Sequence, residues 1–213
     1  MGEGEFLFLL KGLKWTLILS AVGFACGMVA GLGVALARTS GYQAQRRIAA
    51  GYIALFQGTP LLMQLFVVYY GLALYGMKLD AWVAVAFGFT LHASAYLGEI
   101  WRGAIEAVPR GQVEAARALS LGYVSRMKDV VLPQALRISL PATIGFLVQL
   151  IKGTSLAAFV GFTELSRAGS MVSNQIFQPL LVFGIVGLLY FAICWPLSLY
   201  GARLERKFAA AAR

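Results

Sequence analysis

Long apolar runs alternate with short charged stretches along this chain. A helix needs about 20 mostly apolar residues to cross the hydrocarbon core of a bilayer, and five runs come close to or exceed that length. The spans predicted from these runs cover residues 13–37, 48–77, 80–101, 138–162 and 179–202. The pattern therefore predicts an all-α integral membrane protein, with residues 1–213 forming a single transmembrane domain.

The composition agrees with a lipid environment. Hydrophobic residues make up 60% of the chain and charged residues 13%, against about 45–50% and 25% in an ordinary soluble domain. The first ten residues carry Glu3 and Glu5 where a secretory signal would be basic, so we expect the first apolar run to remain as an anchor. Cys26 and Cys194 lie inside apolar runs, and we expect them to be packing residues rather than part of a metal site.

The positions of the lysines and arginines predict the orientation. Cytoplasmic loops of membrane proteins carry an excess of these cations. If the carboxyl terminus is cytoplasmic, residues 38–47, 99–137 and the tail from Arg203 to Arg213 place 13 cations inside, against four outside. This distribution predicts a periplasmic N-terminus and a cytoplasmic C-terminus. Because the cations lie between apolar runs rather than on one face, the net charge of +9 does not indicate binding to nucleic acid.

The stretch of about 102–137 has the charge density of a water-exposed structure. We expect two short helices in it, Gly111–Leu119 and Tyr123–Val131, separated at Gly122, with Pro133 beginning the next element. Both helices are amphipathic. This pattern is compatible with a membrane-surface structure and with a docking surface for a soluble partner, and by itself favours neither.

Four motifs occur in order along nearly the whole chain. Glu114-Ala115-Ala116, followed sixteen to nineteen positions later by Val130-Val131-Leu132-Pro133, resembles the EAA loop of ABC importer permeases. Three further strings are similar to the polar amino-acid branch of that family: Gly58-Thr59-Pro60-Leu61-Leu62, Lys152-Gly153-Thr154-Ser155-Leu156 and Gly161-Phe162-Thr163-Glu164-Leu165. Two departures are Ser120, where the family usually has glycine, and Gly153, where many members have Asp or Asn.

The resemblance implies a type I importer permease fold with five transmembrane helices in the bacterial inner membrane. It also implies three partners: a dimer of ABC ATPase subunits, a second permease that is identical or paralogous, and an extracytoplasmic amino-acid-binding protein. No G-x-x-x-x-G-K-[ST] motif occurs in the chain. We therefore expect no cofactor and no catalytic residue here, and we expect ATP and Mg²⁺ to be bound by the partner ATPase.

By the same resemblance, the 102–137 loop couples the permease to the ATPase. Glu114 is expected to dock the partner, and its alternative role is to cap the helix. Ser120 has a glycine two positions later, at Gly122, and because serine avoids positive φ we expect the turn after this helix to shift slightly. The predicted coupling residues are Glu114, Ala115, Ala116, Ser120, Gly122, Leu132 and Pro133.

Lys152 lies within a predicted span, where an ionisable group costs about 2.5–3.5 kcal/mol and so indicates function. The three residues after it suggest a loosened helix, and Thr59 before Pro60 marks a similar break in the second span. The candidate pathway residues are Thr59, Gln64, His92, Lys152, Gly153, Thr154, Ser155 and Glu164.

Several of these side chains have structural alternatives. The hydroxyls could satisfy helix backbone, His92 could form a hydrogen bond between helices, and Glu164 could cap a short helix over Thr163–Val172. Glu99 is expected to pair with Arg102 at the i+3 position.

Two other classes of membrane protein fit the sequence less well. A proton-coupled secondary transporter needs a carboxylate within a span, and no acid lies at mid-span. A channel would leave the paired helices of the 102–137 loop without a purpose. Gly153 in place of an acid makes the pathway less anionic, which predicts an acidic or neutral amino acid over a basic one.

Overall fold

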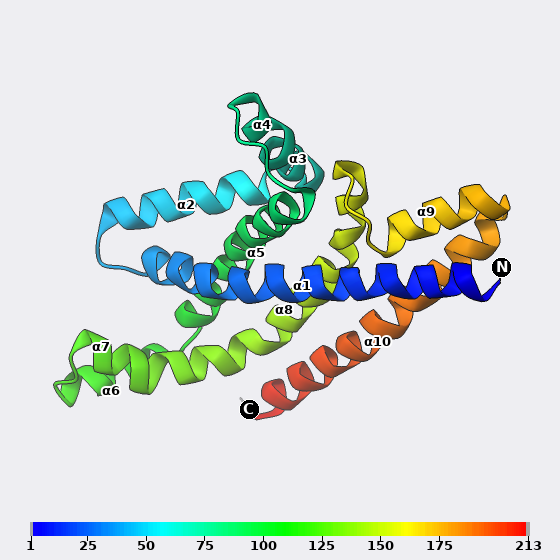
Figure 1. Cartoon of the computed structure of the whole chain (residues 1–213). Helices are drawn as coiled ribbons and strands as arrows, with labels where there is room; N and C mark the ends of the chain where they lie inside the picture. The colour runs from blue at the N-terminus through cyan, green and yellow to red at the C-terminus, as the bar shows by residue number, and fades with distance from the viewer. Residues whose placement is uncertain (1, 212–213) are drawn as a thin grey trace.

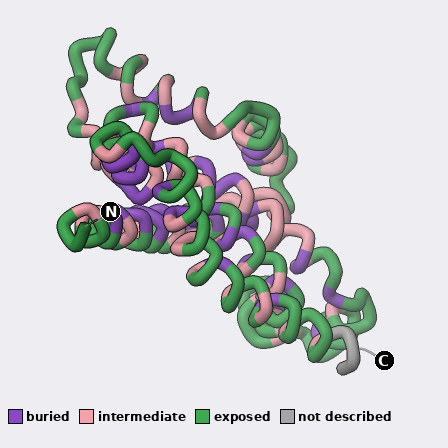
Figure 2. Tube along the Cα trace, turned by 90° about the vertical axis from the view of Figure 1, so that its right-hand side faces the viewer, coloured by how far each residue is buried: buried purple, intermediate pink, exposed green. Residues whose placement is uncertain are grey.

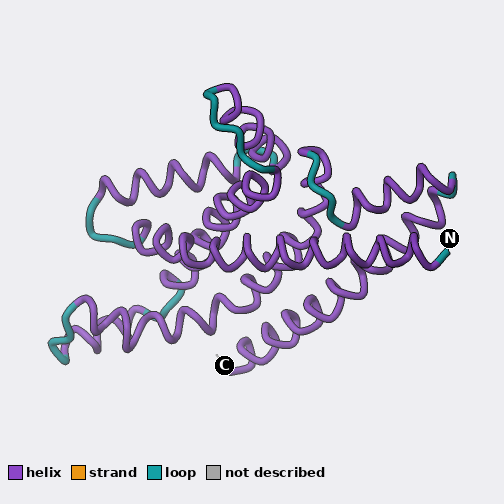
Figure 3. The backbone as a smooth tube through the Cα atoms, viewed as in Figure 1, coloured by secondary structure: helices purple, strands orange, loops and turns teal. Residues whose placement is uncertain are grey.

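The computed structural model describes residues 2–211, and within that range the chain is helical with short connections and no strand (Figure 3). Arg213, which contributes to the basic tail, lies outside the described residues. The α-helices are α1 (Glu3–Arg38), α2 (Gln43–Gln57), α3 (Leu61–Phe66), α4 (Leu72–Leu74), α5 (Ala81–Glu106), α6 (Arg110–Ala118), α7 (Tyr123–Ser125), α8 (Leu132–Gly153), α9 (Leu165–Ile176) and α10 (Pro179–Ala211). Two π-helical turns, η1 (Val67–Gly71) and η2 (Arg126–Val131), and a 3₁₀ helix, η3 (Thr154–Val160), complete the order.

Four helical segments of the described chain are long and apolar enough to cross a membrane by themselves. They are Glu3–Arg38, Ala81–Glu106, Tyr123–Val160 and Pro179–Phe208. A fifth candidate span is the bent pair described next, so the described residues hold up to five spans. An all-helical membrane fold, as predicted from the apolar runs, is confirmed.

The second span, predicted over 48–77, is formed by two helical segments with a sharp bend between them. Gln43–Gln57 and Leu61–Leu74 meet at an angle of 103°. The break falls at Gly58-Thr59-Pro60 because Pro60 has no backbone N–H to donate to the carbonyl four residues earlier, and its ring excludes the α conformation at the preceding residue. The predicted break at Thr59 is therefore confirmed.

The fourth span begins earlier than the predicted residue 138. The expected helix over Tyr123–Val131 is present as α7 and η2, and α8 begins at Leu132 with Pro133 in its first turn. No break separates the two, because one continuous helix covers Tyr123–Val160. The π-helical turn η2 directly precedes Leu132 and Pro133. Such a turn lets a helix pass a proline whose missing N–H would leave a carbonyl free. The Gln134 amide also donates to the Val130 carbonyl at 2.8 Å.

Close contact between α1 and α5 forms the centre of the molecule. A Cβ added at Gly27 would lie 2.4 Å from the Ala93 Cβ. At Gly23 and Gly31 the added Cβ would lie 2.9 Å from the Phe89 Cβ and 3.1 Å from the Leu97 Cβ. These glycines recur every four residues on one face of α1, which is the small-residue pattern that lets membrane helices approach each other. The largest buried cluster contains Phe89, Ala93 and Leu97 at this contact.

The two ends of the molecule carry different elements (Figure 1). The N-terminus and α9 lie at one end, and α6 and α7 lie at the opposite end, with α10 running back from the N-terminal end. Buried residues gather where the helices face one another, and exposed residues cover the outside (Figure 2). Exposed apolar side chains such as Val29 and Leu180 lie on α1 and α10. An apolar outer surface of this kind suits contact with lipid.

Candidate substrate pathway and coupling surface

The break between α2 and α3 and the junction between α8 and η3 meet at a cavity of about 440 Å³. Five of the predicted pathway residues line it: Thr59, His92, Lys152, Gly153 and Ser155. The walls come from the start of α3, from α5 and from the junction between α8 and η3, segments that are far apart in the sequence. The structure therefore brings together most of the side chains that were selected from separate motifs.

One wall of the cavity is formed by the end of α8 and the start of η3. The α-helix stops at Gly153, continues as the 3₁₀ helix η3, and ends at Gly161, whose φ is 88°. The Thr154 hydroxyl is fully buried and donates to the Ile151 carbonyl at 2.6 Å, while the Ser155 hydroxyl donates to the Lys152 carbonyl at 2.8 Å. Both hydroxyls satisfy local backbone. The Lys152 side chain is exposed.

Gly153 lies where the two breaks pack against each other. A Cβ at this position would approach the Leu61 Cδ2 to 3.3 Å and the Phe89 ring to 3.7 Å. The first distance is shorter than most contacts that real Cβ atoms make. The absence of a side chain at position 153 therefore allows α3 to approach this closely.

Gln64 lies behind the cavity wall rather than in it. Its side-chain amide donates to the Phe56 carbonyl at 2.7 Å and to the Thr59 carbonyl at 3.0 Å, and the Nδ1 atom of His92 lies 3.0 Å from its Oε1. His92 is thus hydrogen-bonded between helices, as one interpretation of the sequence expected, and its ring also lines the cavity.

Aromatic residues that the sequence analysis did not select form part of the same wall. Tyr96 and Phe146 line the cavity and stack with ring centroids 5.4 Å apart, and His92 lies 4.5 Å from Tyr96. Gln149 lines it as well. Tyr96 follows His92 by four residues and therefore shares its helix face, which was a usable signal. Gln149 and Phe146 precede Lys152 by about one and about two turns of α8, respectively.

Glu164 is the N-cap of α9, which is the structural alternative that the sequence predicted for it. Its carboxylate accepts hydrogen bonds from the backbone N–H groups of Ser166 and Arg167, at 2.8 and 2.9 Å, and from the Tyr190 hydroxyl at 2.9 Å. Thr16 on α1 completes the set. The side chain is fully buried. Burial raises the pKa of Glu164 because it penalises the charged form, and the two backbone donors oppose that rise.

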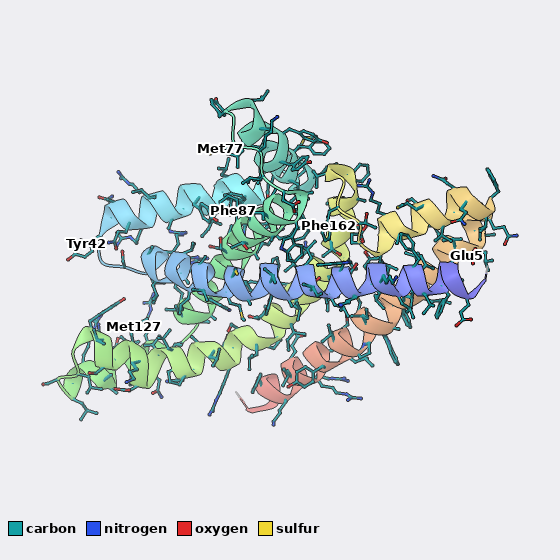
Figure 4. All side chains as sticks on the ribbon, in the orientation of Figure 1. Glu5, Tyr42, Met77, Phe87, Met127 and Phe162 are labelled. Atoms are coloured by element: carbon teal, nitrogen blue, oxygen red, sulfur yellow. The ribbon has the colours of Figure 1, made fainter. Side chains whose placement is uncertain are left out.

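The candidate coupling surface lies on α6. Glu114 and Ala115 are exposed on this helix, and Ala116 is buried on its inner side. Leu119 and Val124, just after α6 and within α7, are 76% and 74% exposed. Met127, which is labelled near this end of the molecule in Figure 4, packs inward with Val113 against the cluster of Ala104, Val108, Val131 and Ala135. The outer face thus combines a carboxylate with exposed apolar side chains.

The turn after α6 is not the one that the sequence suggested. Ser120 itself adopts the left-handed conformation, with φ of 58°, and Gly122 is extended, with φ of −61° and ψ of 166°. The N–H groups of Ser120 and Leu121 donate to the carbonyls of Arg117 and Ala116, which closes the helix in a Schellman motif. The turn therefore stays at the position of the family's glycine.

The predicted ion pair at the end of α5 is confirmed. The Arg102 guanidinium contacts the Glu99 carboxylate at 2.6 Å and also binds Glu106 one turn later. This network lies at the same end of the molecule as α6. It leaves these three charges paired with one another.

Residues 23–209 match the family described as the binding-protein-dependent transport system inner membrane component. The chain is 37% identical over 205 residues to the probable amino-acid ABC transporter permease protein YckA of Bacillus subtilis, a match that covers 96% of this chain and 91% of that protein. It is 36% identical over 205 residues to the arginine transport system permease protein ArtQ of the same organism, covering 94% and 92%.

A solved structure of an amino acid ABC transporter with histidines superposes with a TM-score of 0.88 and 31% identity, covering 95% of this chain and 94% of that one. The all-helical architecture is therefore that of a type I ABC importer permease, and the role is that of a transport component rather than an enzyme. The chain belongs to the family of inner membrane components of binding-protein-dependent transport systems.

Proposed function

We propose that this chain is a permease subunit of an ATP-driven importer that moves a polar amino acid across the bacterial inner membrane. The observation that carries the proposal is the cavity between the two broken spans, with the exposed Lys152 and the hydrogen-bonding side chains of Thr59 and Ser155 in its lining. Every free amino acid has a carboxylate that a lysine cation attracts. Two relatives that match nearly the full length of the chain are named as an amino-acid permease and an arginine permease.

Energy for transport comes from a partner in this proposal. A dimer of ABC ATPase subunits binds ATP and Mg²⁺ and contacts α6, where Glu114 offers a charge and Leu119 and Val124 offer an apolar surface. Ser120 and Gly122 shape the turn after this helix, and Leu132 and Pro133 pass its movement into the continuous helix Tyr123–Val160. An extracytoplasmic binding protein delivers the amino acid, and a second permease, identical or paralogous, completes the pathway within the lipid bilayer.

The lining of the cavity favours one group of amino acids over another. Lys152 and His92 are its basic members, and the position of Gly153 carries no acid. We propose that acidic or neutral amino acids cross faster than basic ones, because a cationic side chain would meet Lys152 without a compensating carboxylate. Transport that is fastest for arginine or lysine in proteoliposomes would contradict this preference.

The test of the coupling is affinity capture of the tagged chain from native membranes in mild detergent. Wild type is compared with Glu114→Lys, and Glu205→Lys serves as a matched control because Glu205 is also an exposed glutamate on a helix, away from α6. We expect an ATPase subunit with wild type and with the control, and about a tenfold loss with Glu114→Lys, as for removal of one partner of an interfacial charge pair.

Two results would overturn the proposal. If a folded wild-type chain captures no ATPase, the ATP-driven mechanism is wrong, and ion-driven transport becomes the hypothesis to test. If Glu205→Lys loses the ATPase as strongly as Glu114→Lys, the effect is one of surface charge and α6 is not the coupling element.

A further inference from the structure

We infer that Gln64 and His92 are positioning residues that hold the bend of the second span, and through it the shape of the cavity, without Gln64 touching the substrate. This inference rests on the proposed function for its transport consequences, but not for its geometry. We call the pair the bend latch. It links α2, α3 and α5 at the point where the two halves of the second span meet at 103°.

The first argument concerns the backbone acceptors that the break leaves free. In an α-helix the Phe56 carbonyl would accept from the N–H of residue 60, which is a proline and has none. The Thr59 carbonyl would accept from the N–H of Met63, but that group donates instead to the Pro60 carbonyl at 3.0 Å. Both orphaned carbonyls accept from one group, the Gln64 side-chain amide, at 2.7 and 3.0 Å.

Leaving such acceptors unpaired away from water costs free energy comparable to a lost hydrogen bond. The Thr59 hydroxyl is also 3.0 Å from the Gln64 amide, and it donates in turn to the Leu55 carbonyl at 2.8 Å. Gln64 therefore stabilises the bent backbone in this geometry, and a straightened segment would give its side chain no such set of acceptors.

The second argument concerns what orients Gln64. Its NH₂ group faces three acceptors, which fixes the amide so that Oε1 faces His92. An amide oxygen only accepts, so the His92 Nδ1 atom carries the hydrogen and donates across 3.0 Å. His92 is 6% exposed, and its ring packs against the Tyr96 ring with centroids 4.5 Å apart, which holds it in place on α5.

The third argument separates this role from direct contact with substrate. Gln64 is 8% exposed and does not line the cavity, whereas Thr59, Pro60, Leu61 and His92 do. The residues that the bend latch holds are thus the cavity wall itself. A change at Gln64 would reach the substrate only through the position of that wall.

The experiment measures the bend directly, in the full chain reconstituted in lipid. Spin labels are attached at Ile48→Cys on α2 and Leu74→Cys on α4, which are both exposed, after Cys26 and Cys194 have been replaced by alanine. Pulsed electron–electron double resonance then gives the distance between the spin labels on α2 and α4. The variants are Gln64→Leu, His92→Leu, and His92→Asn, whose amide places a donor near the former Nδ1 position.

Tyr52→Phe is the matched control. Its hydroxyl links α2 to α5 at the Leu91 carbonyl and at Ser94, at 2.9 and 2.6 Å, but does not contact the break. The control therefore loses an α2–α5 hydrogen bond of the same kind while leaving the bend latch intact. Transport is measured alongside, with the ATPase and binding protein that the wild type captures.

We expect Gln64→Leu and His92→Leu to broaden or shift the distance distribution and to lower the maximal transport rate about tenfold, because the break loses its partner or its anchor. His92→Asn should restore the wild-type distance and most of the rate, and Tyr52→Phe should change neither. An unchanged distance in Gln64→Leu, or an equal change in Tyr52→Phe, overturns the inference. If the wild type transports no amino acid while the distances behave as expected, the proposed function fails and the bend latch stands.

Discussion

At the scale of single residues, Ser120 adopts a backbone conformation that its side chain disfavours. Its φ of 58° lies in the left-handed region, which costs a non-glycine residue about 1–2 kcal/mol. The conformation is imposed by the Schellman motif that ends α6, in which the N–H groups of Ser120 and Leu121 satisfy the last carbonyls of the helix. Strain is therefore held at the end of the proposed coupling helix.

Replacing Ser120 by glycine should relieve that strain. We expect Ser120→Gly to stabilise the turn by about 1 kcal/mol, so that the amides of residues 116–121 exchange with deuterium about fivefold more slowly. Gly122→Ala is the control, because an extended φ of −61° suits alanine. If Gly122→Ala instead accelerates exchange in the turn and Ser120→Gly has no effect, the residue with positive φ is Gly122 and not Ser120.

At the scale of elements, helix contacts depend on positions that lack a side chain. Gly27 faces Ala93 across the α1–α5 contact, whereas Gly33 on the same helix has open space where a Cβ would be. The two glycines look alike in the sequence. Only the partner helix distinguishes them.

We expect Gly27→Ala to destabilise the chain by about 2 kcal/mol, because the new methyl group would lie 2.4 Å from the Ala93 Cβ and the helices must separate. Gly33→Ala should be neutral or stabilising by up to about 1 kcal/mol, since alanine favours a helix over glycine. Thermal unfolding midpoints in detergent compare the two. Equal midpoints would contradict the close α1–α5 approach.

Glu164 joins three elements, since it caps α9 and accepts from Thr16 on α1 and Tyr190 on α10. We expect Glu164→Ala to destabilise α9 by about 3 kcal/mol, because the cap is lost and the partly buried Tyr190 hydroxyl loses an acceptor. Asp80→Ala removes an exposed cap, the one that accepts from the Trp82 N–H, and should cost about 1 kcal/mol. Deuterium exchange over residues 165–176 and 81–86 measures both. A smaller effect at Glu164 than at Asp80 would show that its buried contacts contribute nothing.

At the scale of the whole molecule, the N-terminus and α6 lie at opposite ends (Figure 1). Membrane insertion by the positive-inside rule would place α6 in the cytoplasm and the N-terminus in the periplasm, given 13 inner against four outer cations. Proposed coupling to a cytoplasmic ATPase requires that same orientation. The two arguments are independent of each other.

Cysteine labelling tests this orientation. In chains whose Cys26 and Cys194 have been replaced by alanine, a membrane-impermeant maleimide should label Gly4→Cys in right-side-out vesicles. It should label Ser125→Cys only after permeabilisation, since both positions are exposed but lie at opposite ends. The reverse labelling pattern would place α6 outside and would exclude coupling through this surface.

Local chemistry explains why much of this protein could be predicted from its sequence. Apolar run length sets the number of candidate spans, the missing N–H of Pro60 favours a break in the second span, and Glu164 caps the helix that follows it. Five of the twelve residues that line the cavity were also predicted, in part because Lys152 and Thr59 beside Pro60 stand out within apolar runs. The helix that continues from Tyr123 into the fourth span was missed, because a proline usually marks a start and η2 passes it here.

What only the tertiary structure decided are the contacts between residues distant in the chain. The His92 ring reaches Gln64 across 28 residues, Gly27 meets Ala93, and Glu164 accepts from Thr16 across 148 residues. The 103° bend and the aromatic wall of Tyr96 and Phe146 belong to the same class. Whether a proline breaks a helix depends on packing, since Pro141 and Pro196 lie inside α8 and α10. A sequence indicates where a break can occur, because the missing N–H is a property of one residue. It does not reveal which distant side chain satisfies the carbonyls that the break leaves free, because that depends on how the helices pack.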